Sequence, residues 1–120
     1  MKFYYLGKLM RTSKNHMYTH AVVDMRTGEC IGCRANEENA HAIIRTELSQ
    51  CERSIANCRS AIKALRDGKS GYYEKEGRRT WYNRFSPSTT EERYTTSIER
   101  IEQYMDRIKR DWCVVELEAR

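Results

Sequence analysis

The spacing of apolar residues changes along the chain and divides it into strand-like and helix-like segments. Lys2–Met10 and Tyr18–Met25 are rich in aromatic and apolar residues and are separated by a polar stretch, which predicts a pair of strands. Arg26–Glu29 is a short polar run with a glycine, as a tight turn requires, and Cys30–Arg34 follows it as a third strand. The N-terminal part therefore predicts a three-strand antiparallel meander.

Two long segments carry apolar residues at alternating spacings of four and three, which is typical of helices packed along a seam. The first covers Asn36–Arg66, with Asn36 as the N-cap. The second begins with the capping residues Ser88 and Thr89 and runs to about Arg110. The seam positions are Ile44, Leu48, Cys51, Ile55, Cys58, Ile62 and Leu65, then Tyr94, Ile98, Ile101, Met105 and Ile108. We expect an antiparallel hairpin, with packing of each stripe on the sheet as the alternative.

The last segment, Trp112–Glu118, alternates between two faces, so we expect it to add a strand to the N-terminal sheet. The predicted fold class is α+β: a small antiparallel sheet, made of the three-strand meander plus the C-terminal strand, with a long antiparallel two-helix hairpin. A chain of 120 residues fits a single domain, residues 1–120. Only 39% of the residues are hydrophobic, so we expect a thin core and a homo-oligomer, with a monomer as the alternative.

The net charge of +5 favours acidic partners. Nucleic acid, a phosphorylated small molecule and an acidic protein all fit such an excess of positive charge. No stretch approaches the roughly twenty apolar residues that a membrane span needs, and the start of the chain lacks the apolar run of a signal peptide. We therefore expect a soluble, cytoplasmic protein with no membrane partner.

Five cysteines occur in a chain that we expect inside the cell, where reduced thiols are the default. Cys30 and Cys33 form a C-x-x-C pattern, but a zinc site would need a second close pair. Cys51 and Cys58 are spaced instead as two positions on a helix seam. We expect structural thiols, no metal and no cofactor, with metal or redox use as the alternative.

The connection between the helices, Gly68–Pro87, is too long for a simple turn and mixes aromatic with basic side chains. Aromatic rings stack on bases and arginine forks grip phosphates, so this mixture suits a nucleotide-like small-molecule ligand. Asn83 adds an amide that can read the edge of a base. The candidate binding segment is Trp81, Tyr82, Asn83, Arg84 and Phe85. Alternatively, its rings cover the helix tips or form a subunit contact while the basic residues are solvated.

Arginines outside this segment could close the same site, notably Arg59 on the first helix and Arg110 on the second. A second anion site could form from His16, His20 and Arg26, although turn arginines are usually solvated. No H-E-x-x-H, G-x-S-x-G, Walker or G-x-G-x-x-G motif is present, so no catalytic residue and no metal ligand is assigned. The sequence predicts a binding protein that is not an enzyme.

Four short segments carry a resemblance to a known family: Thr19–Asp24, Thr27–Glu29, Trp81–Asn83 and Glu91–Arg93. Together with the order of sheet, long helix, aromatic and basic loop, second helix and returning strand, they resemble phage anti-Thoeris sponge proteins. Those proteins sequester cyclic ADP-ribose isomers made by bacterial immune enzymes, and they assemble into dimers or larger oligomers. In that family an aromatic residue stacks on adenine, an asparagine contacts the base and arginines bind phosphates. Some members also bind cyclic oligonucleotides at a second site.

The resemblance implies roles for individual residues and a function. Tyr82 or Phe85 would stack on the base, and Asn83 would read it. The phosphates would be held by Arg59, Arg84 and Arg110. The leading hypothesis is a phage anti-defence protein that sequesters a cyclic nucleotide signal, without cleaving it, in the cytoplasm of an infected bacterial host. The alternatives are a protein inhibitor of a host nuclease or CRISPR-type complex, and a nucleic-acid-binding protein.

Overall fold

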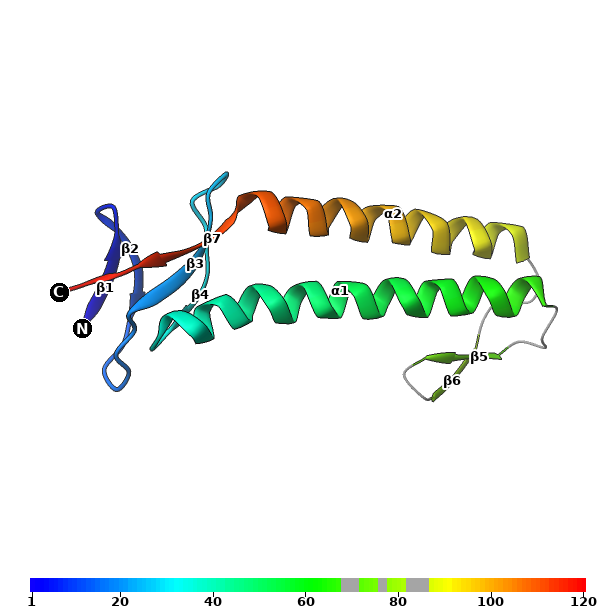
Figure 1. Cartoon of the computed structure of the whole chain (residues 1–120), viewed down its shortest axis with the longest axis horizontal. Helices are drawn as coiled ribbons and strands as arrows, with labels where there is room; N and C mark the ends of the chain where they lie inside the picture. The colour runs from blue at the N-terminus through cyan, green and yellow to red at the C-terminus, as the bar shows by residue number, and fades with distance from the viewer. Residues whose placement is uncertain (68–71, 76–77, 82–86) are drawn as a thin grey trace. The chain divides into compact units, whose positions relative to one another are not determined.

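The computed structural model describes residues 1–67, 72–75, 78–81 and 87–120, and the side chains of 1–67 and 91–120. This part of the chain contains two long helices and short antiparallel strands, which confirms the predicted α+β class (Figure 1). It divides into two compact units: unit 1 is Met1–Leu48 with Asp106–Arg120, and unit 2 is Ser49–Met105. The single domain covering residues 1–120 stays a prediction.

Unit 1 contains two three-stranded antiparallel sheets within the described residues. The first has the order β2-β1-β8, with β1 at Lys2–Tyr5, β2 at Lys8–Thr12 and β8 at Glu118–Ala119. The second has the order β4-β3-β7, with β3 at His20–Asp24, β4 at Cys30–Arg34 and β7 at Trp112–Glu116. The C-terminal segment therefore adds one strand to each N-terminal sheet, β8 to the first and β7 to the second.

The predicted meander is wrong in its first strand. Lys2–Met10 folds back on itself as the β1–β2 hairpin, and β1 pairs with β8 rather than with β3. The two turn residues have positive φ, 49° at Leu6 and 78° at Gly7, which suits a two-residue hairpin turn. Leucine is rare in this left-handed region because its Cβ is crowded there, so the sequence gives little warning of the turn.

The core of unit 1 is built on the inner face of the second sheet. Ala21, Val23 and Cys33 are buried there. The partly buried hydrophobic residues packed against this cluster are Tyr5, Met10, Tyr18, Cys30, Val115 and Leu117, which come from both sheets and their connections. Phe3 is fully buried, and its ring meets the Tyr18 ring edge-on with 5.4 Å between the centroids. These contacts fix Tyr18, which precedes β3, against the first sheet.

The other face of the second sheet lies against the start of α1 (Glu37–Arg66). Val22 on this face is fully buried. A Cβ at its neighbour Gly32 would lie 3.1 Å from Cδ1 of Ile43, so the missing side chain lets the helix approach β4 closely. The helix begins as predicted, because the Asn36 side-chain oxygen accepts a hydrogen bond of 2.8 Å from the backbone N–H of Asn39.

Unit 2 holds the antiparallel hairpin of α1 with α2 (Pro87–Asp111), as predicted. Nε and Nη2 of Arg66, at the end of α1, donate to one oxygen of Glu91 in the first turns of α2, at 3.0 and 2.5 Å. Cys51 and Ile55 of the predicted seam are buried. Two residues outside the predicted seam, Ala61 and Ala64, are also buried in this unit.

The described part of the connection between the helices contains strands that the sequence analysis did not predict. It contains an antiparallel hairpin of β5 (Tyr72–Lys75) and β6 (Arg78–Trp81). The sequence does carry the signal of such a hairpin, because two four-residue runs with aromatic residues are separated by two residues that include Gly77.

Candidate functional site

The predicted binding segment lies largely outside the described residues. Residues 82–86, which include Tyr82, Asn83, Arg84 and Phe85, are not described. The backbone of Trp81 ends β6 and pairs with that of Tyr72. A nucleotide site built from these five residues therefore stays a prediction.

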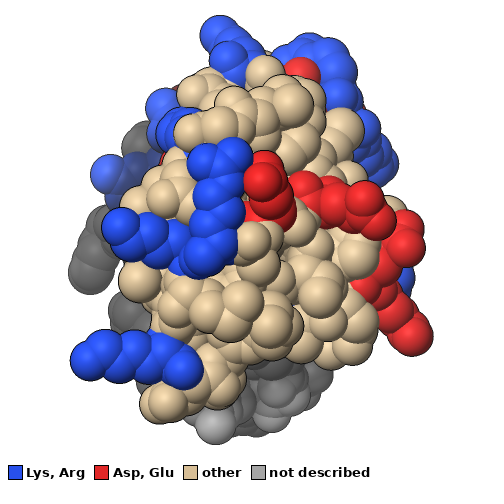
Figure 2. Space-filling model, turned by 90° about the vertical axis from the view of Figure 1, so that its left-hand side faces the viewer, with Lys and Arg blue, Asp and Glu red and all other residues tan. Residues whose placement is uncertain are grey.

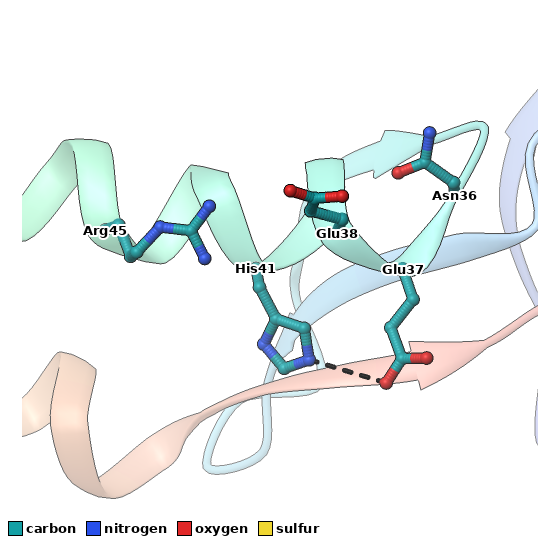
Figure 3. A pocket seen from close by; sticks show the side chains of 5 residues that line it. All are labelled: Asn36, Glu37, Glu38, His41 and Arg45. Carbon is teal, nitrogen blue, oxygen red and sulfur yellow. Dashed lines mark ion pairs between the residues drawn. The ribbon is translucent and has the colours of Figure 1, made fainter.

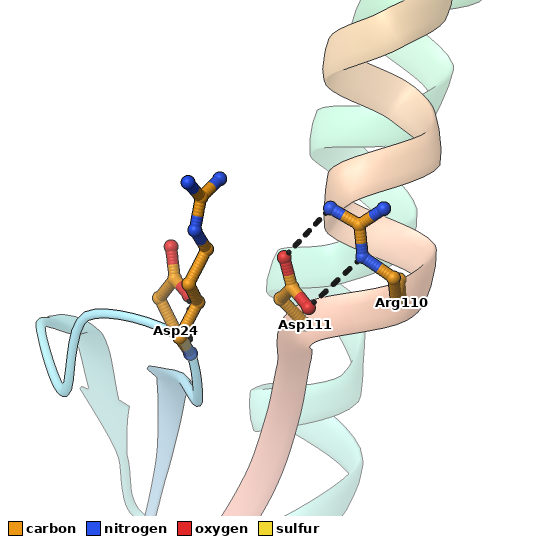
Figure 4. Close-up of polar contacts among 4 residues, drawn as sticks. Asp24, Arg110 and Asp111 are labelled. Carbon is orange, nitrogen blue, oxygen red and sulfur yellow. Dashed lines mark hydrogen bonds and ion pairs between the residues drawn. The ribbon is translucent and has the colours of Figure 1, made fainter.

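The two helix arginines of that predicted site each have a carboxylate partner. Arg59, in unit 2, places Nη2 3.8 Å from Oε1 of Glu102. Arg110, in unit 1, donates from Nε and Nη2 to the two oxygens of Asp111, both at 3.2 Å (Figure 4). These hydrogen bonds and the charge of Asp111 raise the pKa of Arg110 above its ordinary value. A phosphate would have to compete with a carboxylate for either guanidinium.

The three residues of the predicted second anion site do not meet. His20 is the first residue of β3, and its Nδ1 lies 2.8 Å from the Thr19 hydroxyl. Arg26 lies beyond the other end of that five-residue strand, where its backbone N–H donates to the Asp24 carboxylate. Figure 4 shows Asp24 on this turn, near the end of α2. His16 lies before β3, on the side of His20.

His16 instead lines a pocket of about 540 Å³ that contains two arginines, Arg11 and Arg34. We call it the anion pocket. Its lining residues, all in unit 1, are Arg11, Asn15, His16, Met17, Tyr18, Cys33, Arg34, Ala35 and Asn39. These described lining residues include two permanent positive charges, a histidine and two amides, and no carboxylate. Such a lining suits a negatively charged ligand.

The fold holds both arginines of the anion pocket in place. A register shift in the β1–β2 pairing sets Arg11 opposite Phe3. The Arg11 guanidinium carbon then lies 5.2 Å from the centroid of the Tyr18 ring, a cation–π contact. Arg34, at the end of β4, donates from Nη1 to the backbone carbonyl of Cys33 at 2.7 Å.

The pKa of the Cys33 thiol depends on the charged groups around the anion pocket. Burial raises the pKa of its thiol to about 12, helped by the hydrogen bond and the charge of Cys30, while Arg11 and Arg34 act in the opposite direction. The desolvation cost of a thiolate therefore outweighs the attraction of two guanidinium groups. Both arginines nevertheless lie close enough to one buried sulfur for their charges to act on it together.

Two other hollows of the described surface have carboxylates among their lining residues. One of about 520 Å³ at the start of α1 is lined by Asn36, Glu37, Glu38, His41 and Arg45. Figure 3 shows its His41 ring directed toward Glu37, with 3.5 Å between Nε2 and Oε1. Another on α2 is lined by two glutamates and two threonines: Glu91, Glu92, Thr95 and Thr96. Carboxylates make both hollows poor candidates for an anion.

Basic and acidic side chains lie on different sides of one face of the molecule. Figure 2 shows the end of the molecule that carries both chain termini, with basic side chains along the left side and top of this face and acidic ones gathered at the right. An anion that approaches this face is thus attracted to one side of it.

The described residues contain no group of three or more His, Cys, Asp or Glu side chains placed to hold a metal ion. Within the same residues, neither helix is long and apolar enough to cross a membrane. Comparison with protein-family models, with curated proteins and with solved structures gives no match for this chain. The functional argument therefore depends on the chain's own geometry.

Sequence reasoning missed Arg11 and Arg34, which lie 23 positions apart (34 − 11). Arg34 ends β4 and Arg11 is the next-to-last residue of β2, and charged residues at such positions are usually solvated. Only the β1–β2 hairpin, with its unusual Leu6 turn, brings Arg11 to the same pocket as Arg34. His16, which lines the pocket, is the one residue of the predicted second anion site that could have pointed to it.

Proposed function

We propose that this chain binds a phosphate-bearing, nucleotide-like compound without altering it, and that the anion pocket receives a phosphate group. The observation that carries the proposal is the pairing of Arg11 and Arg34 in one pocket without a carboxylate among its described lining residues. Guanidinium groups bind phosphate oxygens through charge-assisted hydrogen bonds, often two at a time.

The size and the neutral polar groups of the anion pocket also fit such a ligand. Its volume of about 540 Å³ lies in the range of pockets that hold small molecules. Asn15 and Asn39 offer amide donors and acceptors, which can bind hydroxyl groups or a base edge. His16 adds a ring nitrogen that can donate a hydrogen bond.

The wider proposal keeps the role that the resemblance implies. The ligand would be a cyclic nucleotide immune signal, a cyclic ADP-ribose isomer or a cyclic oligonucleotide, and a phage protein would hold it in the cytoplasm of the infected host. The segment Trp81–Phe85, in the helix connection, would be a separate candidate site with its own stacking surface, and a homo-oligomer would be the functional form. An anion pocket in unit 1 supports this role because a sponge needs tight binding and no catalytic group.

Isothermal titration calorimetry with a panel of cyclic nucleotides and ADP-ribose isomers tests the proposal. We expect one class to bind, and we expect Arg11→Ala and Arg34→Ala each to weaken it about ten- to a hundredfold, the value of a charged hydrogen bond. Arg26→Ala is the matched control, because Arg26 is an exposed arginine of the same unit that does not line the pocket. Ligand recovered from heat-denatured complex should be chemically intact.

Three results would contradict the proposal. The first is the absence of binding by every compound, and the second is recovery of a cleaved ligand. The third is tight binding that the two pocket arginines do not affect while Tyr82→Ala or Asn83→Ala abolishes it, which would place the site in the helix connection alone. Affinity for nucleic acid that falls steeply with salt would favour the alternative of a nucleic-acid-binding protein.

A further inference from the structure

Cys30 and Cys33 lie on the same face of β4, although residues three apart on a regular strand point to opposite faces. The β3–β4 pairing explains this. Val22 pairs with Gly32, but Val23 pairs with Cys30, so Ile31 is an extra residue that forms a β-bulge. The bulge shifts the alternation by one position and turns both cysteines toward the buried cluster of unit 1.

The two sulfurs are in contact. Their Sγ atoms are 3.6 Å apart, at hydrogen-bonding distance for thiols. Cys30 is partly buried and is the more exposed of the two residues, whereas Cys33 is 1% exposed. The Cys30 thiol can therefore react first with a reagent while the Cys33 thiol lies beside it. This is the arrangement of an attacking and a resolving cysteine.

We propose that Cys30 and Cys33 are a redox-active pair that a small-molecule disulfide oxidises reversibly to an intramolecular disulfide. The Cys30 thiolate attacks one sulfur of the small disulfide, forms a mixed disulfide and releases one thiolate. Cys33 then gives its proton to solvent, attacks the Cys30 sulfur and releases the second thiolate. The two protein thiols lose two electrons and two protons, and the small disulfide is reduced to two thiols.

The surrounding backbone can accommodate the bond. The sulfurs must approach from 3.6 Å to the roughly 2.05 Å of a disulfide, which side-chain rotation or a local contraction of β4 at the bulge can supply. β4 is an edge strand of its sheet, so contraction disturbs hydrogen bonds on one side only.

The burial of Cys33 controls the rate of the second step, in which Cys33 attacks the mixed disulfide on Cys30. Its pKa of about 12 leaves only a small thiolate fraction near neutral pH, and the thiolate is the species that attacks. In the mixed disulfide the effect of burial on Cys33 remains while that of the Cys30 thiol is lost, so resolution should still accelerate as the pH rises from 7 to 9. An exposed thiol with an ordinary pKa would approach a plateau over the same range.

The test uses oxidised glutathione on the full-length protein, followed by trypsin and mass spectrometry. Cleavage after Arg26 and Arg34 gives a peptide, residues 27–34, that contains Cys30 and Cys33 and no other cysteine. We expect this peptide to become lighter by two hydrogen atoms, to resist alkylation and to recover with added thiol. Cys113 is the control, because it is exposed and lies alone in the peptide 111–120. Cys113 should therefore remain as a mixed disulfide with glutathione.

Variants separate the two roles. Cys33→Ser should stop at a stable glutathione adduct on Cys30, and Cys30→Ser should leave residue 33 unmodified in the folded protein. A wild-type peptide 27–34 that stays reduced while Cys113 reacts would overturn the proposal, as would a lasting adduct on Cys30. The readout does not involve ligand binding, so the outcome is independent of the proposed function.

Discussion

The turn between β1 and β2 carries backbone strain that one substitution should release. Leu6 has a φ of 49°, and a residue with a Cβ loses about 1–2 kcal/mol in this left-handed region. Asparagine tolerates the region and is the preferred residue before glycine in such a turn. Leu6 is 87% exposed, so its removal loses only about a tenth of the 1.5–3 kcal/mol of a fully buried leucine. We therefore expect Leu6→Asn to raise the free energy of unfolding by about 1 kcal/mol.

Urea unfolding followed by circular dichroism measures this change, and hydrogen exchange at the hairpin amides reports it for unit 1 separately. Leu6→Ala is the control, since it removes most of the same side chain but lacks the side-chain amide whose local hydrogen bonds let asparagine tolerate the left-handed region. Its stability should stay within about 0.5 kcal/mol of the wild type. The reasoning is refuted if Leu6→Asn is no more stable than Leu6→Ala, because the turn then gains nothing from a residue suited to positive φ.

Two further predictions concern the contacts of α1 with its surroundings. Asn36→Ala should lower the free energy of unfolding by about 1 kcal/mol through loss of the helix cap, whereas Asn36→Asp should keep it; equal losses in both variants would contradict the cap. Gly32→Val should cost about 1–3 kcal/mol by overpacking against Ile43, and much of this cost should disappear in an Ile43→Ala background. Additive effects in that double-mutant cycle would show that the two residues do not touch.

Helices were predictable because their signals are local. Asn36 caps α1 as expected, and its end at Arg66 coincides with the expected end before Gly68. α2 begins at Pro87, one residue before the expected capping residues, which is within the usual uncertainty of a helix boundary. The seam prediction identified Cys51 and Ile55 but omitted Ala61, since small residues carry little weight in a pattern of large apolar ones.

Strand pairing was less predictable because it depends on distant contacts. The apolar run of Lys2–Met10 looks like one strand, and the turn at Leu6 and Gly7, both at positive φ, divides it into β1 and β2. The bulge at Ile31 is likewise invisible in the sequence, yet it decides that Cys30 and Cys33 share a face. Both features are single-residue departures from regular geometry, and each changes which side chains meet in unit 1.

The arginines of the two predicted and observed sites differ in the contacts that each would lose on binding an anion. Arg110 and Arg59 already have carboxylate partners, so a phosphate there would replace one charged contact with another. Arg11 and Arg34 are held by a ring and by a backbone carbonyl, which position the guanidinium groups without neutralising them. Holding such a side chain beforehand avoids about 0.5–1.5 kcal/mol of entropy loss on binding. Within the described part of the chain, the anion pocket therefore combines two arginines that have no carboxylate among the lining residues with a contact that orients each guanidinium group. An anionic ligand gains most free energy where both conditions hold.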